Sequence, residues 1–344
     1  MSGLSVDSLD GPQGDGEGPE KIKDSQAPEQ LAGRSPTRIA LGRLAKDKVA
    51  VVCTAILVIY IALALLAPVI TGLMDIYPDQ KAPGAPSPSE MLEMGGLPSF
   101  GPPNYPFTWD HPLGIEPRTG RDLTALLLYG LQTSLMVATL ATVVSTIVGV
   151  SIGLIAGYSK GLLDSVLSFI IDFFLSFPFI LGALALAPII ATRFGADQDS
   201  LRRAELLALV GVLVLFGWMG LARLIRGQVL SLREREFIQA AQVIGVPTWQ
   251  ILFKELLPNL VAPIVVAVSL ALPGYVAAEA GLSFLGIGLT ESPSLGKTVN
   301  SASAFFEVYP LYLWTPVITI MVLVIALNLV GDSIRDAFDP KTRR

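Results

Sequence analysis

The chain contains 344 residues, of which 52% are hydrophobic and only 15% are charged, and its mean hydropathy is +0.60. This composition excludes an ordinary soluble domain and indicates an integral membrane protein. The net charge of −5 comes largely from segments outside the apolar runs and does not indicate a nucleic-acid partner. Because there is one cysteine, Cys53, and one histidine, His111, we expect no internal disulfide, no metal site and no cofactor.

The N-terminal part divides at the first apolar run. Residues 1–33 are rich in Gly, Pro, Asp and Glu, and we expect a disordered cytoplasmic tail. Residues 34–70 form a juxtamembrane segment and a first membrane span. Its apolar run starts at Val49 and continues for about 22 residues, or roughly 33 Å of helix, against a bilayer core of about 30 Å. We therefore predict a span and not a signal peptide.

Residues 71–130 form a long outer loop, rich in Pro and Gly in its first part. A loop of this length is either a linker or a docking surface. Its last part, TGRDLTALLLYG, is more ordered, because Thr119 and Asp122 have the spacing of a capping box. We expect an apolar helix there, at the outer membrane interface and leading into the second span.

Five further apolar runs are long enough to cross the bilayer: residues 131–158, 166–191, 205–224, 260–285 and 311–331. The expected fold is an all-α polytopic membrane protein with six transmembrane helices, five of them in a core at 131–331. Most of the 24 lysines and arginines then fall on one side. The positive-inside rule therefore predicts that both termini, including the tail 332–344, and the loop 223–257 are cytoplasmic.

The cytoplasmic loop contains REREFIQAAQVIG, in which apolar or small residues share one helical face. These residues are Phe237, Ala240, Ala241 and Ile244. We predict a short amphipathic helix, ended by Gly245 through a helix stop or a close backbone approach, and a second short helix from about Thr248 to Leu257. The pattern alone is compatible with a helix lying on the membrane surface or with a partner-docking knob.

This loop resembles the cytoplasmic signature E-A-A-x3-G-x9-I-x-L-P of permease subunits in binding-protein-dependent ABC importers. The residues that match in register are Ala240, Ala241, Gly245, Leu257 and Pro258. Gln239 stands where the acid is expected, and Glu255 where isoleucine is expected. The segments at 111–135, 155–181, 217–237, 278–289 and 328–340 also look like the second, C-type permease of the dipeptide and oligopeptide subfamily. In the outer motif the subfamily usually has an aspartate, whereas this chain has Glu116 after Ile115.

The resemblance implies a type I permease fold in a bacterial cytoplasmic (inner) membrane and a non-catalytic subunit. It also implies a heterodimer with a sister permease, two ATP-binding cassette subunits, an extracytoplasmic solute-binding protein and a peptide substrate. The short helix would be a coupling helix seated in an ATPase groove. Its expected contact residues are Arg235, Glu236, Gln239, Ala240, Ala241 and Gly245. The alternatives are the same machinery carrying another solute such as nickel, an ion-driven secondary transporter, and a non-transporting scaffold.

Two acidic residues, Asp172 and Glu279, lie inside apolar runs. A carboxylate at mid-bilayer costs at least about 2.5 kcal/mol, so each side chain should face protein or water. Both are candidates for the translocation pathway or its gate, with a packing hydrogen bond as the alternative. The SLGKT stretch at 294–298 is not a phosphate-binding loop, because Glu291 stands where the first glycine is required.

Small residues recur every four positions in the second predicted span and predict a helix-packing seam, either within the subunit or toward a sister subunit. They are Ser145, Gly149, Gly153 and Gly157. Pro178 and Pro273 interrupt the third and fifth spans, and each predicts a static kink or a hinge.

Overall fold

The computed structural model describes residues 42–78, 87–99, 108–194, 198–289 and 292–338. Within these ranges the regular structure is helical, apart from two isolated β-bridges, which agrees with the all-α prediction. The predicted tail at 1–33 lies outside the described residues, as do parts of the outer loop and the last six residues. Five helices are long and apolar enough to cross a membrane, and a sharply bent pair supplies a sixth element.

The first span is α2, Lys48–Met74. Asp47 caps its start, because its carboxylate accepts a hydrogen bond from the Val49 backbone N–H at 2.9 Å. The helix ends at Asp75, which takes the left-handed conformation with φ 57°. A one-turn helix, α3 (Pro88–Met91), lies in the outer loop.

The second span is α4, Leu123–Tyr158, a helix of 36 residues. At 1.5 Å per residue it is roughly 54 Å long, so it extends well beyond a bilayer core. The expected interface helix and the second span are therefore one continuous helix that begins at Leu123 and not at Leu131. The predicted capping box is wrong: Asp122 is itself the cap and accepts from the Ala125 N–H at 2.9 Å, whereas Thr119 donates to Glu116.

The third span is broken and does not form the single helix predicted at 166–191. It consists of α5 (Leu162–Ser176) and α6 (Phe179–Phe194), bent by 85°. The break lies at Phe177, whose backbone is extended, because the residue before a proline is disfavoured in the helical region. Pro178 thus produces a corner. Pro273, by contrast, lies buried inside a helix that continues through it.

The fourth span is formed by α7 (Gln198–Leu215) and α8 (Met219–Arg233), and it leads into the short α9 (Glu236–Val243). After α9 the chain runs through α10 (Thr248–Gln250), the π-helical η1 (Ile251–Leu256) and α11 (Leu257–Phe284) as one helical stretch. The second short helix expected from Thr248 is thus the start of the fifth span.

The π-helical turn lies where the backbone must accommodate Pro258, which has no N–H to donate. The Asn259 side chain donates to the Glu255 carbonyl at 2.6 Å and so satisfies one acceptor beside the turn. The chain ends in α12 (Leu295–Ser303) and the long α13 (Pro310–Phe338).

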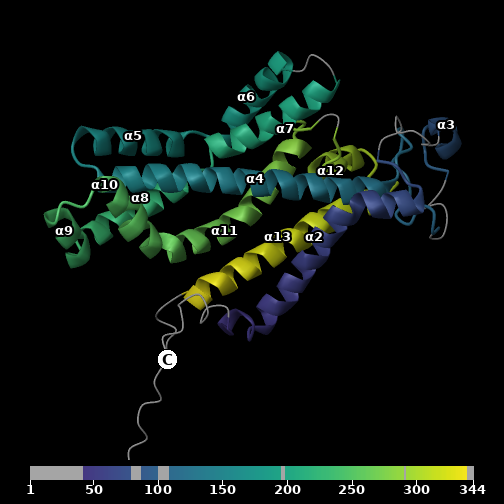
Figure 1. Cartoon of the computed structure of the whole chain (residues 1–344). Helices are drawn as coiled ribbons and strands as arrows, with labels where there is room; N and C mark the ends of the chain where they lie inside the picture. Colours follow the sequence, from purple (N-terminus) through teal and green to yellow (C-terminus); the bar gives the residue numbers. More distant parts are fainter. Residues whose placement is uncertain (1–41, 79–86, 100–107, 195–197, 290–291, 339–344) are drawn as a thin grey trace, which may run out of the picture.

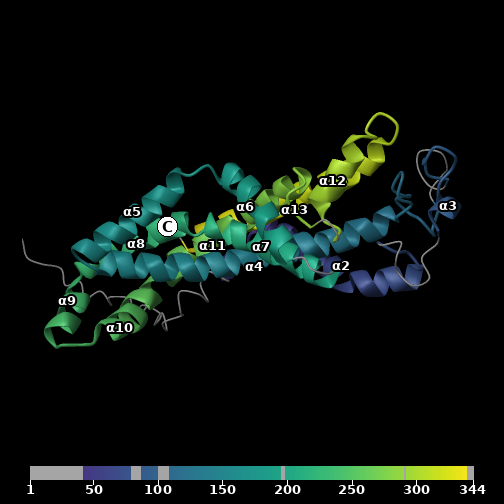
Figure 2. The ribbon, with the colours of Figure 1, turned by 90° about the horizontal axis from the view of Figure 1, so that it is seen from above.

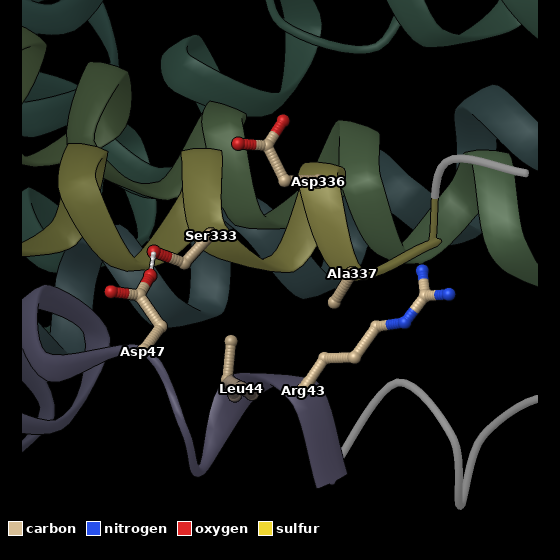
Figure 3. A pocket seen from close by; sticks show the side chains of 6 residues that line it. All are labelled: Arg43, Leu44, Asp47, Ser333, Asp336 and Ala337. Carbon is tan, nitrogen blue, oxygen red and sulfur yellow. Dashed lines mark hydrogen bonds between the residues drawn. The ribbon is translucent and has the colours of Figure 1, made fainter. Parts of the chain in front are cut away.

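The helices are arranged along α4, as Figures 1 and 2 show. The knob formed by α9 and α10 lies at one end of α4, and α3 with the outer loop lies at the other end (Figure 1). Helices α2 and α13 run side by side. The carboxylate of Asp47 accepts a hydrogen bond from the Ser333 hydroxyl at 2.7 Å and so joins the start of α2 to the end of α13, beside a hollow of about 210 Å³ (Figure 3).

The predicted seam lies within the subunit, between α4 and α8. A Cβ atom at Gly149 would lie 2.8 Å from the Trp218 carbonyl oxygen, and one at Gly153 would lie 2.7 Å from that of Ala222. At Gly157 a Cβ would meet the Val229 side chain at 2.6 Å. Because any larger residue would push the helices apart, these glycines let α4 and α8 pack in direct backbone contact over more than two turns.

Candidate functional site

The knob at the end of α8 is anchored in the helix bundle by a buried side chain. Ile238 of α9 is completely buried and belongs to a cluster with residues of α4, α8, η1 and α11. The buried members are Leu154, Ile225, Val229, Ile251, Leu256 and Leu260. The predicted face did not include Ile238, because only the fold shows which side of so short a helix meets the bundle.

The glycine turn after α9 is a Schellman motif. The Val246 N–H donates to the Ala241 carbonyl at 3.0 Å, and the Gly245 N–H donates to the Gln242 carbonyl at 3.1 Å. Gly245 has φ +84°, and a Cβ there would meet nothing within 4 Å. Within this subunit Gly245 therefore acts as the helix stop, not as a site of close backbone approach.

Four large apolar side chains on the knob and in the following turn, η1, are uncovered. Val243 is 88% exposed and Ile244 is 80% exposed, and Trp249 and Phe253 are also exposed. An exposed apolar patch of this kind on a protruding element is typical of a protein-binding surface. We call these four residues the knob patch.

The six residues predicted to contact an ATPase all lie on this knob, and Arg235, Glu236, Gln239, Ala240 and Gly245 are exposed. Ala241 is half-buried. The Gln239 amide donates to the Glu234 carbonyl at 3.3 Å, so it holds the α8–α9 turn from a position where the signature has an acid.

The knob is also bonded to the end of α4. The Gln242 amide donates to the Tyr158 hydroxyl at 3.3 Å. The Arg233 guanidinium donates to the carbonyls of Gly157 and Ser159, each at 3.4 Å, where a cation complements the negative end of the helix dipole. Motion of α9 would therefore reach α4 as well as α8.

Asp172 of α5 forms an ion pair with Arg223 of α8 at 2.8 Å, and both side chains are more than half exposed. A second pair, Asp164 with Arg226 at 2.9 Å, joins the same helices but is more covered. Sequence reasoning identified Asp172 but neither arginine, because the two helices are about 50 residues apart in the chain.

Glu279 of α11 has a different environment from Asp172, because its side chain is completely buried. The Ser283 hydroxyl donates to one carboxyl oxygen at 2.8 Å, and the hydroxyls of Ser134 and Ser294 also face the carboxyl. In this conformation Glu279 is enclosed by α4, α11 and the start of α12, an arrangement suited to packing. Ser294 is the cap of α12, so the SLGKT stretch begins a buried helix.

An aromatic cluster surrounds the break between α5 and α6 and the break between α7 and α8. This cluster was not predicted from the sequence. The Phe216 ring lies 5.6 Å from that of Phe177 and 6.0 Å from that of Phe179, measured between centroids. Phe216 and Phe179 line a hollow of about 260 Å³ together with Tyr275. The available signal was the clustering of phenylalanines on both sides of Pro178.

Metal-binding geometry is not found among the residues that the structure describes: none of them form a group of three or more His, Cys, Asp or Glu side chains able to hold an ion. The Nδ1 atom of His111 lies 2.8 Å from Asp122. His111 thus contacts the residue that caps α4.

A bundle of membrane-spanning helices with a protruding knob and exposed apolar side chains indicates a membrane protein that docks a partner subunit. The family model of the binding-protein-dependent transport system inner membrane component matches residues 149–344, and that of the N-terminal TM domain of oligopeptide transport permease C matches residues 35–86. The chain belongs to the family of binding-protein-dependent transport system inner membrane components. It is a permease subunit of an ABC importer, and its general partners are ATPase subunits, a substrate-binding protein and a sister permease.

Known relatives cover nearly the whole chain. The dipeptide transport system permease protein DppC of Alkalihalophilus pseudofirmus is 34% identical over 92% of this chain and 93% of its own length. The oligopeptide transport system permease protein OppC of Escherichia coli K12 is 33% identical over 91% and 94%. A solved inward-facing structure of the MetNI methionine ABC transporter matches 62% of this chain and 96% of that chain, with a TM-score of 0.50 and 21% identity, and supports the fold.

Proposed function

We propose that this permease conducts dipeptides or oligopeptides across a bacterial inner membrane and forms one half of the pathway, with a sister permease as the other half. The names of the two full-length relatives support this cargo class. In this proposal both termini and the α9 knob lie in the cytoplasm, and an extracytoplasmic binding protein delivers the peptide. The observation that carries the ATP coupling is the exposed knob patch at one end of α4 and α8.

The knob is the coupling element in this proposal. An ATPase subunit contacts Val243 and Ile244 together with the exposed polar residues of α9. Displacement of α9 passes through buried Ile238 into the cluster with α8, and from α8 through the glycine seam into α4. A seam in which the backbones are already in contact transmits such a displacement, because its helices cannot approach more closely.

The energy for import comes from ATP through this contact. Moving a two-state permease from 1:99 to 99:1 requires about 10⁴-fold tighter binding to the favoured state, or about 5.5 kcal/mol. ATP-bound ATPases and the loaded binding protein must therefore both prefer the outward-facing form. After hydrolysis the permease returns to the inward-facing form and releases the peptide.

Crosslinking tests the docking surface. With a Val243→Cys variant and a short bifunctional reagent in native membranes, we expect capture of an ATP-hydrolysing subunit. A Trp109→Cys variant is the matched control, because Trp109 is 86% exposed but lies in the outer loop. Capture from Trp109→Cys and not from Val243→Cys would reject the assignment.

A substitution at the turn tests the coupling. We expect Gly245→Asp to leave membrane insertion intact and to abolish peptide uptake while ATP hydrolysis continues. Gly245→Asn is the control, because asparagine tolerates the left-handed conformation and adds no charge. Normal peptide uptake by the Gly245→Asp variant would contradict the coupling role.

Purification in mild detergent separates the remaining possibilities. A co-eluting pair of ATPases supports an importer subunit, whereas a lone carrier driven by an ion gradient would reject it. Loss of labelled-peptide uptake on deletion of the chain tests the cargo against another solute such as nickel.

A further inference from the structure

The ion pair between Asp172 and Arg223 is unusually exposed for charges inside membrane-spanning helices. The Asp172 side chain is 58% exposed and that of Arg223 is 65% exposed. The neighbouring pair of Asp164 and Arg226 connects the same two helices, with exposed fractions of 27% and 29%. The two ion pairs therefore join the same helices but differ in their exposure, so the more covered pair can serve as a comparison.

This exposure identifies the environment of that face of α5 and α8. Charged side chains in membrane segments face a protein interior or a water-filled cavity, because contact with hydrocarbon is strongly unfavourable. Within this subunit the Asp172–Arg223 pair is not covered, so the face that carries it is turned away from lipid. In the proposed pair of permeases, such a face would be turned toward the sister subunit or toward a water-filled space between the two subunits.

The pair is also held loosely. Asp172 accepts one side-chain hydrogen bond, from the Arg223 guanidinium. Asp164, by comparison, accepts two from Arg226 and one from the Ser168 hydroxyl. Exposed ion pairs contribute little to stability. Breaking the contact between Asp172 and Arg223 so that each can bind a charged ligand therefore costs little free energy.

We propose that Asp172 and Arg223 form a binding site for the charged termini of the transported peptide, in the water-filled part of the pathway. Asp172 binds the peptide amino group, and Arg223 binds the terminal carboxylate, for which a guanidinium is well suited. The unoccupied site is closed by the ion pair itself. The assignment rests on the proposed cargo and defines the ligand as a zwitterion with both termini free.

Cysteine accessibility tests whether this face lies in water. In native membranes that contain the complete transporter, Asp172→Cys and Arg223→Cys should react with a small, charged thiol reagent. Leu65→Cys on α2 is the control: its side chain is 70% exposed on an apolar helix, so it should face lipid and remain unlabelled. The native Cys53 is buried and should not react. Absence of labelling at both positions of the pair would overturn the proposal.

Protection from labelling tests the ligand. A saturating free dipeptide should slow the reaction of the Arg223→Cys thiol, beside which Asp172 is intact, at least five-fold, and the N-acetylated form of the same dipeptide should not. Equal protection by both forms, or by neither, would overturn the assignment of Asp172 to the amino group.

Uptake kinetics separate binding from packing. We expect Asp172→Asn and Arg223→Gln to raise the KM for a free dipeptide about ten-fold with little change in maximal rate. Asp164→Asn and Arg226→Gln should instead lower the amount of assembled transporter and leave KM unchanged. Identical kinetic effects at the two pairs would overturn the proposal.

The cargo itself is tested by the unmodified protein. Membranes that take up no peptide with the binding protein present would overturn the proposed function together with the ligand assignment. If the unmodified protein takes up peptide, but the Arg223→Cys thiol is labelled without any peptide protection, only the ligand assignment is overturned.

Discussion

Gly153 of α4 lies so close to Ala222 of α8 that a Cβ atom on the glycine would come within 2.7 Å of the alanine carbonyl oxygen. The same Cβ would come 2.8 Å from the side chain of Ile225, which is completely buried. This contact connects the fourth span, and with it the knob, to α4, which extends from the outer loop to the knob (Figure 1).

We expect Gly153→Val to separate α4 from α8 and to destabilise the subunit by about 1–3 kcal/mol, as overpacking of a close helix contact does. The measurement is the thermal unfolding temperature in detergent. Gly227→Ala on α8 is the control, because its Cβ would meet nothing within 4 Å. Equal unfolding temperatures for the two variants would contradict the seam.

Ile238 and Val243 lie on the same short helix and should respond in opposite ways to truncation. Ile238→Ala removes a fully buried side chain and should cost about 2–5 kcal/mol, because a cavity remains in the cluster below the knob. Val243→Ala should leave the unfolding temperature unchanged, because Val243 is exposed. Its effect should instead be weaker co-purification of the ATPase. Both quantities can be measured on one detergent preparation, and a large stability loss in Val243→Ala would reject this division.

The junction of α2 and α13 should make stability depend on pH. The Ser333 hydroxyl, as the main cause, lowers the pKa of the Asp47 carboxyl below its ordinary value of 3.8. Burial opposes this shift, and the N–H groups of Val49 and Ala50 add to it. A lowered pKa in the folded state means that the ionised carboxylate stabilises the fold. This contribution is complete above the ordinary pKa and is lost as the pH falls through the folded value.

We therefore expect Ser333→Ala to unfold at a lower temperature than the unmodified protein at neutral pH. The difference should shrink as the pH falls below the ordinary pKa of 3.8 and through the lower folded value, where Asp47 becomes protonated in the folded state as well. Unfolding temperatures measured from pH 7 to pH 3 test this, and a difference that stays constant across the range would show that the hydrogen bond to Asp47 is not its cause.

Glu116 connects the outer loop to α13. Its carboxylate is buried, lies 2.5 Å from the Arg121 guanidinium and accepts a hydrogen bond from the Tyr312 hydroxyl at 2.5 Å. Tyr312→Phe should destabilise the subunit by about 1.5–3 kcal/mol, the usual contribution of a hydrogen bond to a charged group. Tyr309→Phe is the matched control, because the buried Tyr309 hydroxyl has no hydrogen-bond partner among the described residues. Equal losses in stability would contradict a specific role for the Glu116 contact.

Local features of the fold could be predicted from the chain alone. The lengths of the apolar runs identified the membrane-spanning segments, and Gly245 and Pro247 identified the end of the short helix. Both the length of an apolar run and the end of a helix depend on residues that are neighbours in the chain. Pro178 was recognised as an interruption, but not as a corner of 85°. The size of a bend depends on what packs against it, here Phe216 beside the break.

The amino-acid sequence by itself determined that this protein lies in a membrane, where its long helices run and which short loop carries the permease signature. Only the tertiary structure decided that Ile238 anchors the knob, that Asp172 is exposed beside Arg223 and that Glu279 is enclosed. In a membrane protein both lipid-facing and protein-facing positions are apolar, so periodicity does not distinguish them. Which side of each helix is covered follows from contacts between segments far apart in the chain.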